Sequence, residues 1–315
     1  MDEKSNRLVS VIVVTAGVKD YIFSCLDSLR KQNYPATEVI IIDNFLNPVL
    51  GSRILSGYSF ARIYPGKRSL SYCDSLNKGI GLAKGDFILC LNDDVVLSGG
   101  FITEAIKGFD IGEKIGMVSG KVLRLDGKLI DSTGLYLSLW RTAKERGYGC
   151  KDTGQFDKPG YIFGVTGAVA FYRRKMLEEV KIKDEYFDSD FGFFYEDLDI
   201  GWRANNSGWK GYYMPSAIAY HARGGTARAG NNGTGKKYAR IYLSEELHFK
   251  LIKNRYFTII KNENIVNFII HLPFIIIYDL SILTLILLFR IKVLKIFFFE
   301  PIGLTRAFKK RRGWR

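Results

Sequence analysis

Phe87-Ile88-Leu89-Cys90-Leu91-Asn92-Asp93-Asp94 is the stretch that decides the fold. Five apolar residues are followed directly by an asparagine and two adjacent carboxylates. An unbroken apolar run of this length predicts a strand that is buried on both faces of a parallel sheet. Ligands of such sheets bind beyond the carboxyl ends of the strands, and paired oxygen donors there suit a hard divalent cation that also holds phosphates. The alternative is a strand end closed by a turn, because Asn and Asp are ordinary turn residues.

The residues before this stretch repeat a strand–helix–strand pattern. Residues 8–15 and 38–43 are apolar and β-branched, and residues 19–31 between them place apolar side chains on one helical face. A short strand at 61–64 and a helix at about 69–83 lead into the opening stretch. The pattern predicts an α/β fold with a mixed, mostly parallel sheet flanked by helices, in which two strands end in acids. No Gly-x-Gly-x-x-Gly follows the first strand, which disfavours a dinucleotide site.

The second half of the sheet is expected to carry further site residues. Residues 115–130 predict short strands joined by glycine turns, at an antiparallel edge or in a hairpin. Residues 164–170 are small and apolar, and glycines there indicate either close approach of a ligand or packing against a helix. An aromatic run ends at Glu196-Asp197-Leu198-Asp199. These acids are either ordinary residues of a first helical turn or include a general base in a cleft with aromatic walls. His221 ends a strand and is a candidate metal ligand.

Residues 230–237 nearly match a phosphate-binding P-loop. Lys237 stands where a Ser or Thr would bind Mg²⁺, and no apolar strand leads into the segment. We therefore favour a basic flap that closes over a diphosphate, formed by Arg223, Arg228, Lys236 and Lys237.

The charge distribution favours a membrane surface over nucleic acid. The net charge is +14, and residues 290–315 contribute +8 of it, with nine Lys and Arg against one acid. This basic segment follows an apolar one, an arrangement typical of proteins that contact anionic lipid. The N-terminus lacks an apolar signal core, and the four cysteines, Cys25, Cys73, Cys90 and Cys150, are scattered. Reduced thiols and a cytoplasmic location of the first domain are therefore expected.

Residues 265–289 are almost wholly apolar and long enough to span a bilayer. Pro273 and Asp279 lie within them, and an acid at mid-bilayer is costly. A span would also place the basic tail outside if the first domain is inside, against the positive-inside tendency. An interfacial or re-entrant helix is therefore favoured. The expected organisation is a catalytic domain over residues 1–235 and a helical membrane-associating region over residues 236–315, attached peripherally or monotopically to the cytoplasmic face of the cell membrane.

Taken together, the motifs resemble family 2 glycosyltransferases of the GT-A fold, among them rhamnosyltransferase-like members. The resemblance covers about residues 8–261. Each piece alone is weak, but eight occur in the family's order: VSVIVVT (9–15), CLDSL (25–29), EVIIIDN (38–44), NKGI (77–80), LNDD (91–94), GA (167–168), FFYEDLD (193–199) and YH (220–221).

The resemblance implies a role for each site residue. Asp94 would bind Mg²⁺ or Mn²⁺, with Asn92 as a weaker ligand and His221 completing the metal site. Thr15 and Asp43 would hold the nucleotide base, Asp93 would face the ribose, and Asn77 belongs to the same nucleotide-sugar site. Asp197 matches the catalytic base. Glu196, Gly167 and Ala168 would line the acceptor site.

Two departures from the family pattern lie around the nucleotide pocket. Ala16-Gly17 replaces the usual Tyr-Asn after the first strand, and Leu46 and Asn47 stand where a Ser and a further Asp are expected. The function that the resemblance implies is inverting transfer of a sugar from a UDP- or dTDP-sugar to a hydroxyl of a cell-surface glycan or lipid-linked acceptor, as in polysaccharide biosynthesis. Rhamnose is a candidate for the sugar.

Two rival functions differ in what they require. A sugar nucleotidyltransferase needs a Gly-rich loop with Arg and Lys after the first strand, and residues 15–19 (TAGVK) lack it. A catalytically degenerate, membrane-docked protein that binds sugar nucleotides would keep the fold and lose turnover.

Overall fold

The computed structural model describes residues 7–15, 20–44, 48–66, 70–223, 244–294 and 303–313. The predicted basic flap, apart from Arg223, and the departures at 16–17 and 46–47 lie outside these residues.

The helices are α1 (Tyr21–Arg30), α2 (Pro48–Gly57), α3 (Tyr72–Leu82), α4 (Phe101–Ile106), the 3-10 helix η2 (Lys107–Ile111), α5 (Arg174–Val180), α6 (Glu196–Asn206), α7 (Glu245–Asn262), α8 (Ile265–Phe289) and α10 (Leu304–Gly313). The strands are β1 (Val9–Thr15), β2 (Thr37–Asp43), β3 (Ala61–Pro65), β4 (Phe87–Asn92), β5 (Val95–Leu97), β6 (Ile115–Arg124), β7 (Ile130–Ser132), β8 (Leu135–Leu137), β9 (Ala143–Glu145), β10 (Gly160–Ile162), β11 (Val169–Arg173) and β12 (Lys210–His221).

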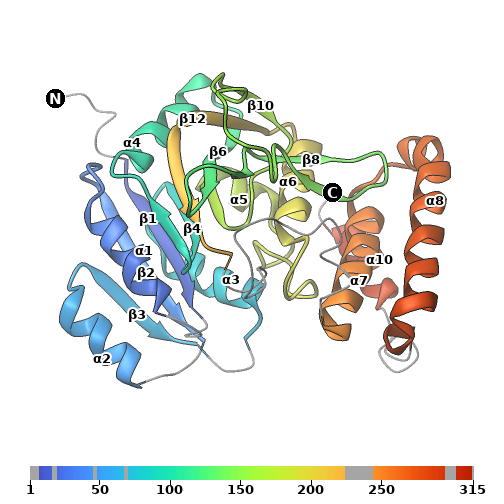
Figure 1. The fold of residues 1–315 in the computed structure, drawn as a ribbon, viewed down its shortest axis with the longest axis horizontal. Coiled ribbons are helices and arrows are strands. Elements are labelled where there is room, and N and C mark those ends of the chain that lie inside the picture. The colour runs from blue at the N-terminus through green and yellow to red at the C-terminus, as the bar shows by residue number, and fades with distance from the viewer. Residues whose placement is uncertain are drawn as a thin grey trace.

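A mixed sheet forms the centre of the molecule (Figure 1), with the strand order β10-β12-β6-β11-β4-β1-β2-β3. Strands β4, β1, β2 and β3 run parallel, as the sequence predicts. Their register pairs Thr15 with Asp43 and Val14 with Asn92. The polar residues that end these three strands therefore meet at one edge of the sheet.

Strand β1 shows why the sheet is buried on both faces. Val11 and Val13 belong to the core on one side, and Ile12 and Val14 belong to the core on the other side. Successive side chains of a strand point to opposite faces, so an unbroken apolar run supplies both cores. Helices α1, α2 and α4 contribute to the first core, whereas α3, α5 and α6 contribute to the second.

The position of β6 differs from the first of the two predicted arrangements, an antiparallel edge. β6 lies inside the sheet between β11 and β12, pairing antiparallel with the first and parallel with the second. The predicted hairpin is present as well, because β6 also pairs with β7. All but one of its ten residues are buried. The glycines in this stretch interrupt its apolar pattern, so hydrophobic periodicity does not predict this burial.

The predicted domain boundary at residue 235 falls outside the described residues. Helix α7, on its far side, packs into the core of the first domain: Phe257 belongs to the same buried cluster as the residues of α6. Lys261 is fully buried and forms ion pairs with Asp188 at 2.6 Å and Asp199 at 2.9 Å. Burial alone would raise the pKa of Asp188, but the charges of Lys261 and Lys310 lower it to about 2.

Replacing Lys261 by Met should destabilise the protein by about 3–5 kcal/mol, because it leaves two buried carboxylates short of a counter-charge. Lys250→Met is the matched control on the same helix, since Lys250 pairs with Glu246 at the surface and such pairs contribute at most about 1 kcal/mol. Thermal unfolding of both variants measures the difference. Equal shifts in Tm would show that the buried pair does not secure α7.

Candidate active site

The second of the two adjacent carboxylates lies next to a histidine from the other half of the sheet. β5 and β12 pair so that His221 stands beside Val95, which brings His221 Nε2 to 3.2 Å from Asp94 Oδ1. The other ring nitrogen, Nδ1, hydrogen-bonds with Asp131 Oδ2 at 2.8 Å. A carboxylate behind a histidine fixes the ring orientation and directs the free nitrogen toward a ligand.

Asp131 on β7 was missed by sequence reasoning. Its side chain is 1% exposed and forms ion pairs with Arg124 at 2.7 Å and Arg223 at 2.6 Å. Burial would raise the pKa of Asp131, but the hydrogen bond with His221 and the charge of Arg223 lower it. Asp131 therefore stays ionised and anchors the histidine. A lone acid in a short strand gives no sequence signal of this role.

The arrangement of Asp94 and His221 fits a divalent cation. Mg²⁺ usually binds through one or two protein ligands together with substrate phosphates, and here a carboxylate and an imidazole converge at a strand end. Within the described ranges, no group of three or more His, Cys, Asp or Glu side chains is placed to hold a metal by itself. A two-ligand site of this kind relies on the diphosphate of a substrate for its remaining ligands.

Asn92 is directed away from this pair. Its Oδ1 accepts a hydrogen bond from the Tyr72 hydroxyl at 2.8 Å, and the same hydroxyl lies 3.2 Å from the Gly167 carbonyl oxygen. The backbone N–H of Asn92 donates to the carbonyl of Ala168. The structure therefore assigns Asn92, expected as a weak metal ligand, to the contact between β4 and the segment that precedes β11.

Thr15, Asp43 and Asp93 gather at the shared edge of β1, β2 and β4. The Thr15 hydroxyl donates to Asp93 Oδ2 at 2.6 Å, which ties β1 to the turn after β4. Asp43 is buried at the end of β2, and its carbonyl accepts from the Gly66 N–H. The three predicted nucleotide-binding residues are thus neighbours in space, although they are up to 78 positions apart in sequence.

Asn77, the fourth predicted nucleotide-binding residue, has a structural role instead. Its Oδ1 accepts from the backbone N–H groups of Tyr186 and Phe187, and its Nδ2 donates to the Phe187 carbonyl at 2.6 Å. Both ends of the amide are used, so Asn77 holds the loop that leads to the acidic turn. We do not include it in the nucleotide site.

The turn before Glu196 has an unusual backbone. Phe194 and Tyr195 both have φ near +70° (72° and 71°), a region that non-glycine residues avoid and that recurs at functional sites. Asn254 of α7 stabilises this conformation, because its Nδ2 lies 2.9 Å from the carbonyl oxygens of Phe191, Phe193 and Phe194. Helix α7 therefore shapes the entry into α6, a contribution that sequence reasoning missed.

Asp197 is fixed by backbone donors. Its Oδ2 accepts from the Gly167 N–H at 3.0 Å, and its Oδ1 accepts from the Leu198 N–H at 2.7 Å. A Cβ on Gly167 would lie 3.2 Å from Glu196 Oε1 and 3.4 Å from Asp197 Oδ2. The missing side chain thus leaves room for both carboxylates, which accounts for a small residue at this position.

Glu196 and Asp197 have different surroundings. Glu196 is buried, and its Oε2 has no hydrogen-bond partner among the described residues. Burial, followed by the charge of Asp197, raises the pKa of Glu196 to about 8. Asp197 is half-buried, and burial raises its pKa against the effect of its backbone donors. Asp197 is thus the more accessible of the two carboxylates, although it is only partly exposed.

A further acid, Glu145 of β9, was not predicted. It accepts a hydrogen bond from the Thr166 hydroxyl at 2.9 Å and another from Ser132. Burial and then the charge of Asp197 raise its pKa to about 7. Glu145 thus adjoins the segment that presents Gly167 to Asp197.

Asp199 behaves as its spacing predicts. Its carboxylate pairs with Arg203 one turn later at 2.9 Å and accepts from Asn262 Nδ2 at 2.8 Å. Asp199 therefore braces Arg203, as expected for an acid and a base four residues apart on a helix, and its side chain is buried.

The Glu196→Gln variant should become more stable relative to the wild type as pH rises. Because the folded-state pKa of Glu196 is about 8 and the ordinary value is 4.5, its contribution to stability is fully present below pH 4.5 and is lost as pH rises through 8. Gln has no proton to lose. Thermal unfolding from about pH 5 to about pH 9 measures the difference in Tm between the two proteins. A difference that does not grow with pH would contradict the raised pKa.

The fold and the paired strand-end residues define a protein of the GT-A type. Solved structures that share its fold include GalNAc-T7 with UDP, GalNAc and Mn²⁺, with a TM-score of 0.58 and 14% identity over 85% of this chain and 56% of that one. They also include S. aureus TarS 1–349, with a TM-score of 0.54 and 16% identity over 82% of this chain and 66% of that one. Residues 6–240 match the family described as Glycosyltransferase like family 2. The chain belongs to this family, and the predictions of the family and of the fold are confirmed.

Curated relatives of the chain include the poly-β-1,6-N-acetyl-D-glucosamine synthase of Staphylococcus epidermidis. The two are 20% identical over 217 residues, which are 67% of this chain and 49% of the relative. The chain thus spans about half the length of the curated relative it matches. The prediction of a glycosyltransferase is confirmed at the level of the family.

Proposed function

We propose that the chain transfers a sugar from a UDP- or dTDP-sugar to a hydroxyl of a membrane-held glycan or lipid-linked acceptor, with inversion at the anomeric carbon. The observation that carries this proposal is a chain of close polar contacts, centred on the Tyr72 hydroxyl, between the two ends of the site. Asn92, which precedes the strand-end carboxylates, bonds with Tyr72; Tyr72 reaches the Gly167 carbonyl; and the Gly167 N–H holds Asp197. A donor diphosphate at Asp94 and a base at Asp197 are thereby fixed relative to one another.

Each residue has one task in this mechanism. Asp94 and His221 would hold a divalent cation, which when bound neutralises charge on a departing diphosphate. Thr15, Asp43 and Asp93 would contact the nucleoside. Asp197 would accept the proton of the acceptor hydroxyl as its oxygen attacks the anomeric carbon, in a single displacement that expels the nucleoside diphosphate.

The acceptor hydroxyl would be held beside this base. Glu196 has a buried oxygen with no partner among the described residues, which suits a hydrogen bond with that hydroxyl. The backbone around Gly167 and Ala168 adjoins both carboxylates and would form the remaining wall. The acceptor would thus lie on the Asp197 side of the site, opposite the diphosphate.

Isothermal titration with UDP- and dTDP-sugars in the presence of Mn²⁺ tests the donor. Metal-dependent binding of one nucleotide class is expected, and binding of neither would contradict the proposal. Binding without any turnover would instead favour a catalytically degenerate protein.

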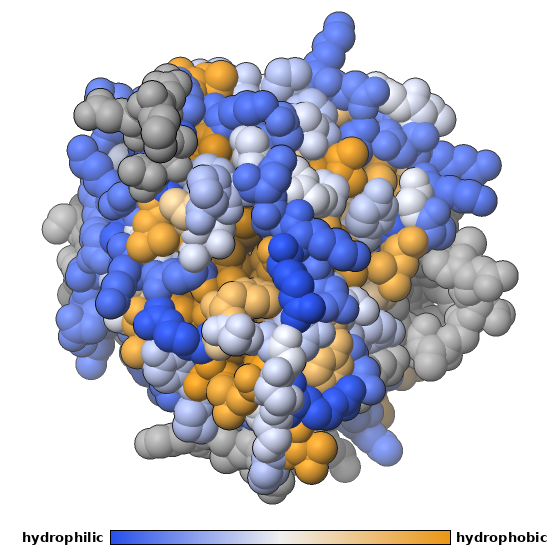
Figure 2. All heavy atoms as spheres, turned by 90° about the vertical axis from the view of Figure 1, so that its left-hand side faces the viewer, coloured by the Kyte–Doolittle hydropathy of each residue, from blue (hydrophilic) through white to orange (hydrophobic). Residues whose placement is uncertain are grey.

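We also propose that α8 attaches the chain to the cytoplasmic face of the membrane. Among the described residues, α8 is the one helix long and apolar enough to cross a bilayer, and only 11% of its most apolar window is buried. It lies at one end of the molecule beside α7 and α10 (Figure 1). On the opposite face, hydrophilic and hydrophobic residues are interspersed (Figure 2). Asp279, which argued against a span, pairs with Arg255 at 2.6 Å.

Part of the predicted basic tail binds the protein instead of facing lipid. Lys310 of α10 pairs with Asp188, Asp190 and Glu185, and Arg306 pairs with Asp190. The acids of the loop that leads to α6 attract these cations, because both segments lie against α7. Lys292, just beyond α8, and Lys309 of α10 remain exposed and could still contact anionic lipid.

Introducing two charges on the exposed face of α8, as Ile269→Glu with Ile277→Glu, should abolish flotation with lipid vesicles. Each change removes an apolar side chain that would contribute about 1.5–3 kcal/mol when buried in lipid. Val49→Glu is a matched control, because Val49 is 66% exposed on α2 and Ile269 is 62% exposed. Flotation that the α8 charges do not reduce would refute attachment through α8.

A further inference from the structure

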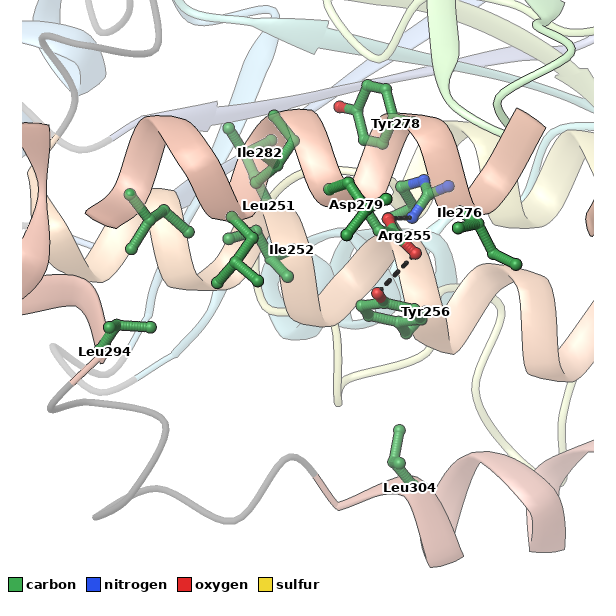
Figure 3. Close-up of a pocket in the computed structure, with 13 residues that line it drawn as sticks. Leu251, Ile252, Arg255, Tyr256, Ile276, Tyr278, Asp279, Ile282, Leu294 and Leu304 are labelled. Carbon is green, nitrogen blue, oxygen red and sulfur yellow. Dashed lines mark hydrogen bonds and ion pairs between the residues drawn. The ribbon is translucent and has the colours of Figure 1, made fainter. Parts of the chain in front are cut away.

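A cavity of about 540 Å³ lies between α7 and α8 (Figure 3). Leu251 and Ile252 line it from α7, and Ile282 and Ile286 line it from α8. Leu294 and Leu304 complete the apolar lining. The volume lies within the range of about 300–1,000 Å³ that is typical of ligand sites. The cavity is separate from the carboxylates and the histidine described above.

The charged residues of the cavity wall neutralise one another. Arg255 Nη1 lies 2.6 Å from Asp279 Oδ1, and the Tyr256 hydroxyl donates to Asp279 Oδ2 at 2.8 Å (Figure 3). The remaining guanidinium nitrogens of Arg255 donate to the Trp140 carbonyl. Because the ion pair is satisfied internally and the rest of the lining is mostly apolar, the cavity suits an uncharged hydrocarbon and not a polar headgroup.

The cavity opens toward the proposed membrane surface. Ile276, Leu280 and Leu283 line it and are also among the exposed apolar residues of α8. The opposite face of α7, which carries Asn254 and Lys261, is buried against the acidic turn of the active site. A molecule in the cavity is therefore separated from Glu196 and Asp197 by the width of a helix.

We propose that this cavity binds one acyl chain of a bilayer phospholipid. The inference rests on the membrane attachment proposed above. A phospholipid is favoured over the tail of a lipid-linked acceptor, because the cavity lies on the far side of α7 from the carboxylates that an acceptor must reach. A bound chain would add apolar contact between α8 and α7 and so hold the membrane helix against the helix that shapes the active-site turn.

Photolabelling in vesicles tests the site. The full chain is bound to vesicles of phosphatidylglycerol and phosphatidylcholine that carry a diazirine in one acyl chain, and labelled residues are mapped by mass spectrometry after irradiation. The lining residues of α7 and α8 should be labelled. Ile282→Trp and, independently, Leu251→Trp should lose this labelling while still floating with the vesicles, because an indole at either position narrows the space between α7 and α8 that an acyl chain would occupy. Ile270→Trp, on the exposed face of α8 outside the cavity, should keep it.

The outcomes that would overturn the inference are distinct. Labelling confined to the outer face of α8, or kept by both cavity-filling variants, would refute the site alone. Loss of labelling on adding an unlabelled isoprenyl phosphate, but not on adding unlabelled phospholipid, would show that the occupant is an isoprenoid tail. Wild-type protein that does not float would refute membrane attachment, and the lipid site with it, without bearing on sugar transfer.

Discussion

Replacing Asp197 by Asn is expected to lower turnover by about 10²–10⁴-fold, the usual cost of losing a general base. Asn keeps the size of the side chain and its Oδ1 can still accept one backbone hydrogen bond, so the turn before α6 should persist. Nucleotide binding should be unchanged, because the nucleotide residues lie at the ends of β1, β2 and β4. Initial rates and nucleotide titrations on the same preparation separate the two effects.

The neighbouring acids are the controls for this assignment. Glu196→Gln should raise the KM for acceptor more than it lowers kcat, because the buried oxygen without a partner is replaced by an amide. Asp199→Asn should lower stability, since Asp199 pairs with Arg203 and Lys261 in the core. If Asp197→Asn turns over normally and Glu196→Gln is inactive, the base is Glu196 and our assignment is wrong.

Replacing Asp94 by Ala should abolish transfer and weaken metal-dependent nucleotide binding. The change removes the carboxylate beside His221 and leaves a single protein ligand of the pair. Asp131→Asn should give a smaller loss of metal-dependent activity, about 10–100-fold, because Asp131 acts on the metal through the histidine that it orients. Titration of nucleotide with and without Mn²⁺, followed by rate measurements, shows which of the two variants loses more nucleotide binding and more transfer activity.

Asp110→Ala is a suitable control for these variants, since Asp110 forms a surface pair with Arg7 away from the site. Full activity of the wild type in excess EDTA would contradict the metal requirement. Equal losses for Asp131→Asn and Asp94→Ala in thermal stability as well as in activity would indicate that the cluster is only structural.

The ends of the strands could be predicted from sequence because their signal is local. The run 87–91 can be read without knowing its neighbours, and parallel register then places Thr15, Asp43 and Asn92 at one edge. The acids at 196–199 follow an aromatic run in the same way. Local patterns of this kind were enough to predict the fold class and to name most members of the candidate site.

Other features depend on contacts between distant segments, which no local pattern records. Asn77 was assigned to the nucleotide because its motif matched, yet its amide is used by a loop about 110 positions away. Asp131 is identified only by its contact with His221, 90 positions away. Helix α7 has a weakly patterned polar sequence, and its part in the core appears only when Asn254 and Lys261 meet their partners.

Nucleoside diphosphate release measures the central claim most directly, namely that Asp197 drives a single displacement at a donor held by Asp94. The full chain is incubated with UDP- and dTDP-sugars, Mn²⁺ and a membrane glycolipid extract, and the released nucleotide and the anomeric configuration of the product are followed by NMR. We predict consumption of one donor class, a product of inverted configuration, and release by Asp197→Asn that is about 10²–10⁴-fold slower than by the wild type. Retained configuration, or equal release by wild type and Asp197→Asn, would contradict the account.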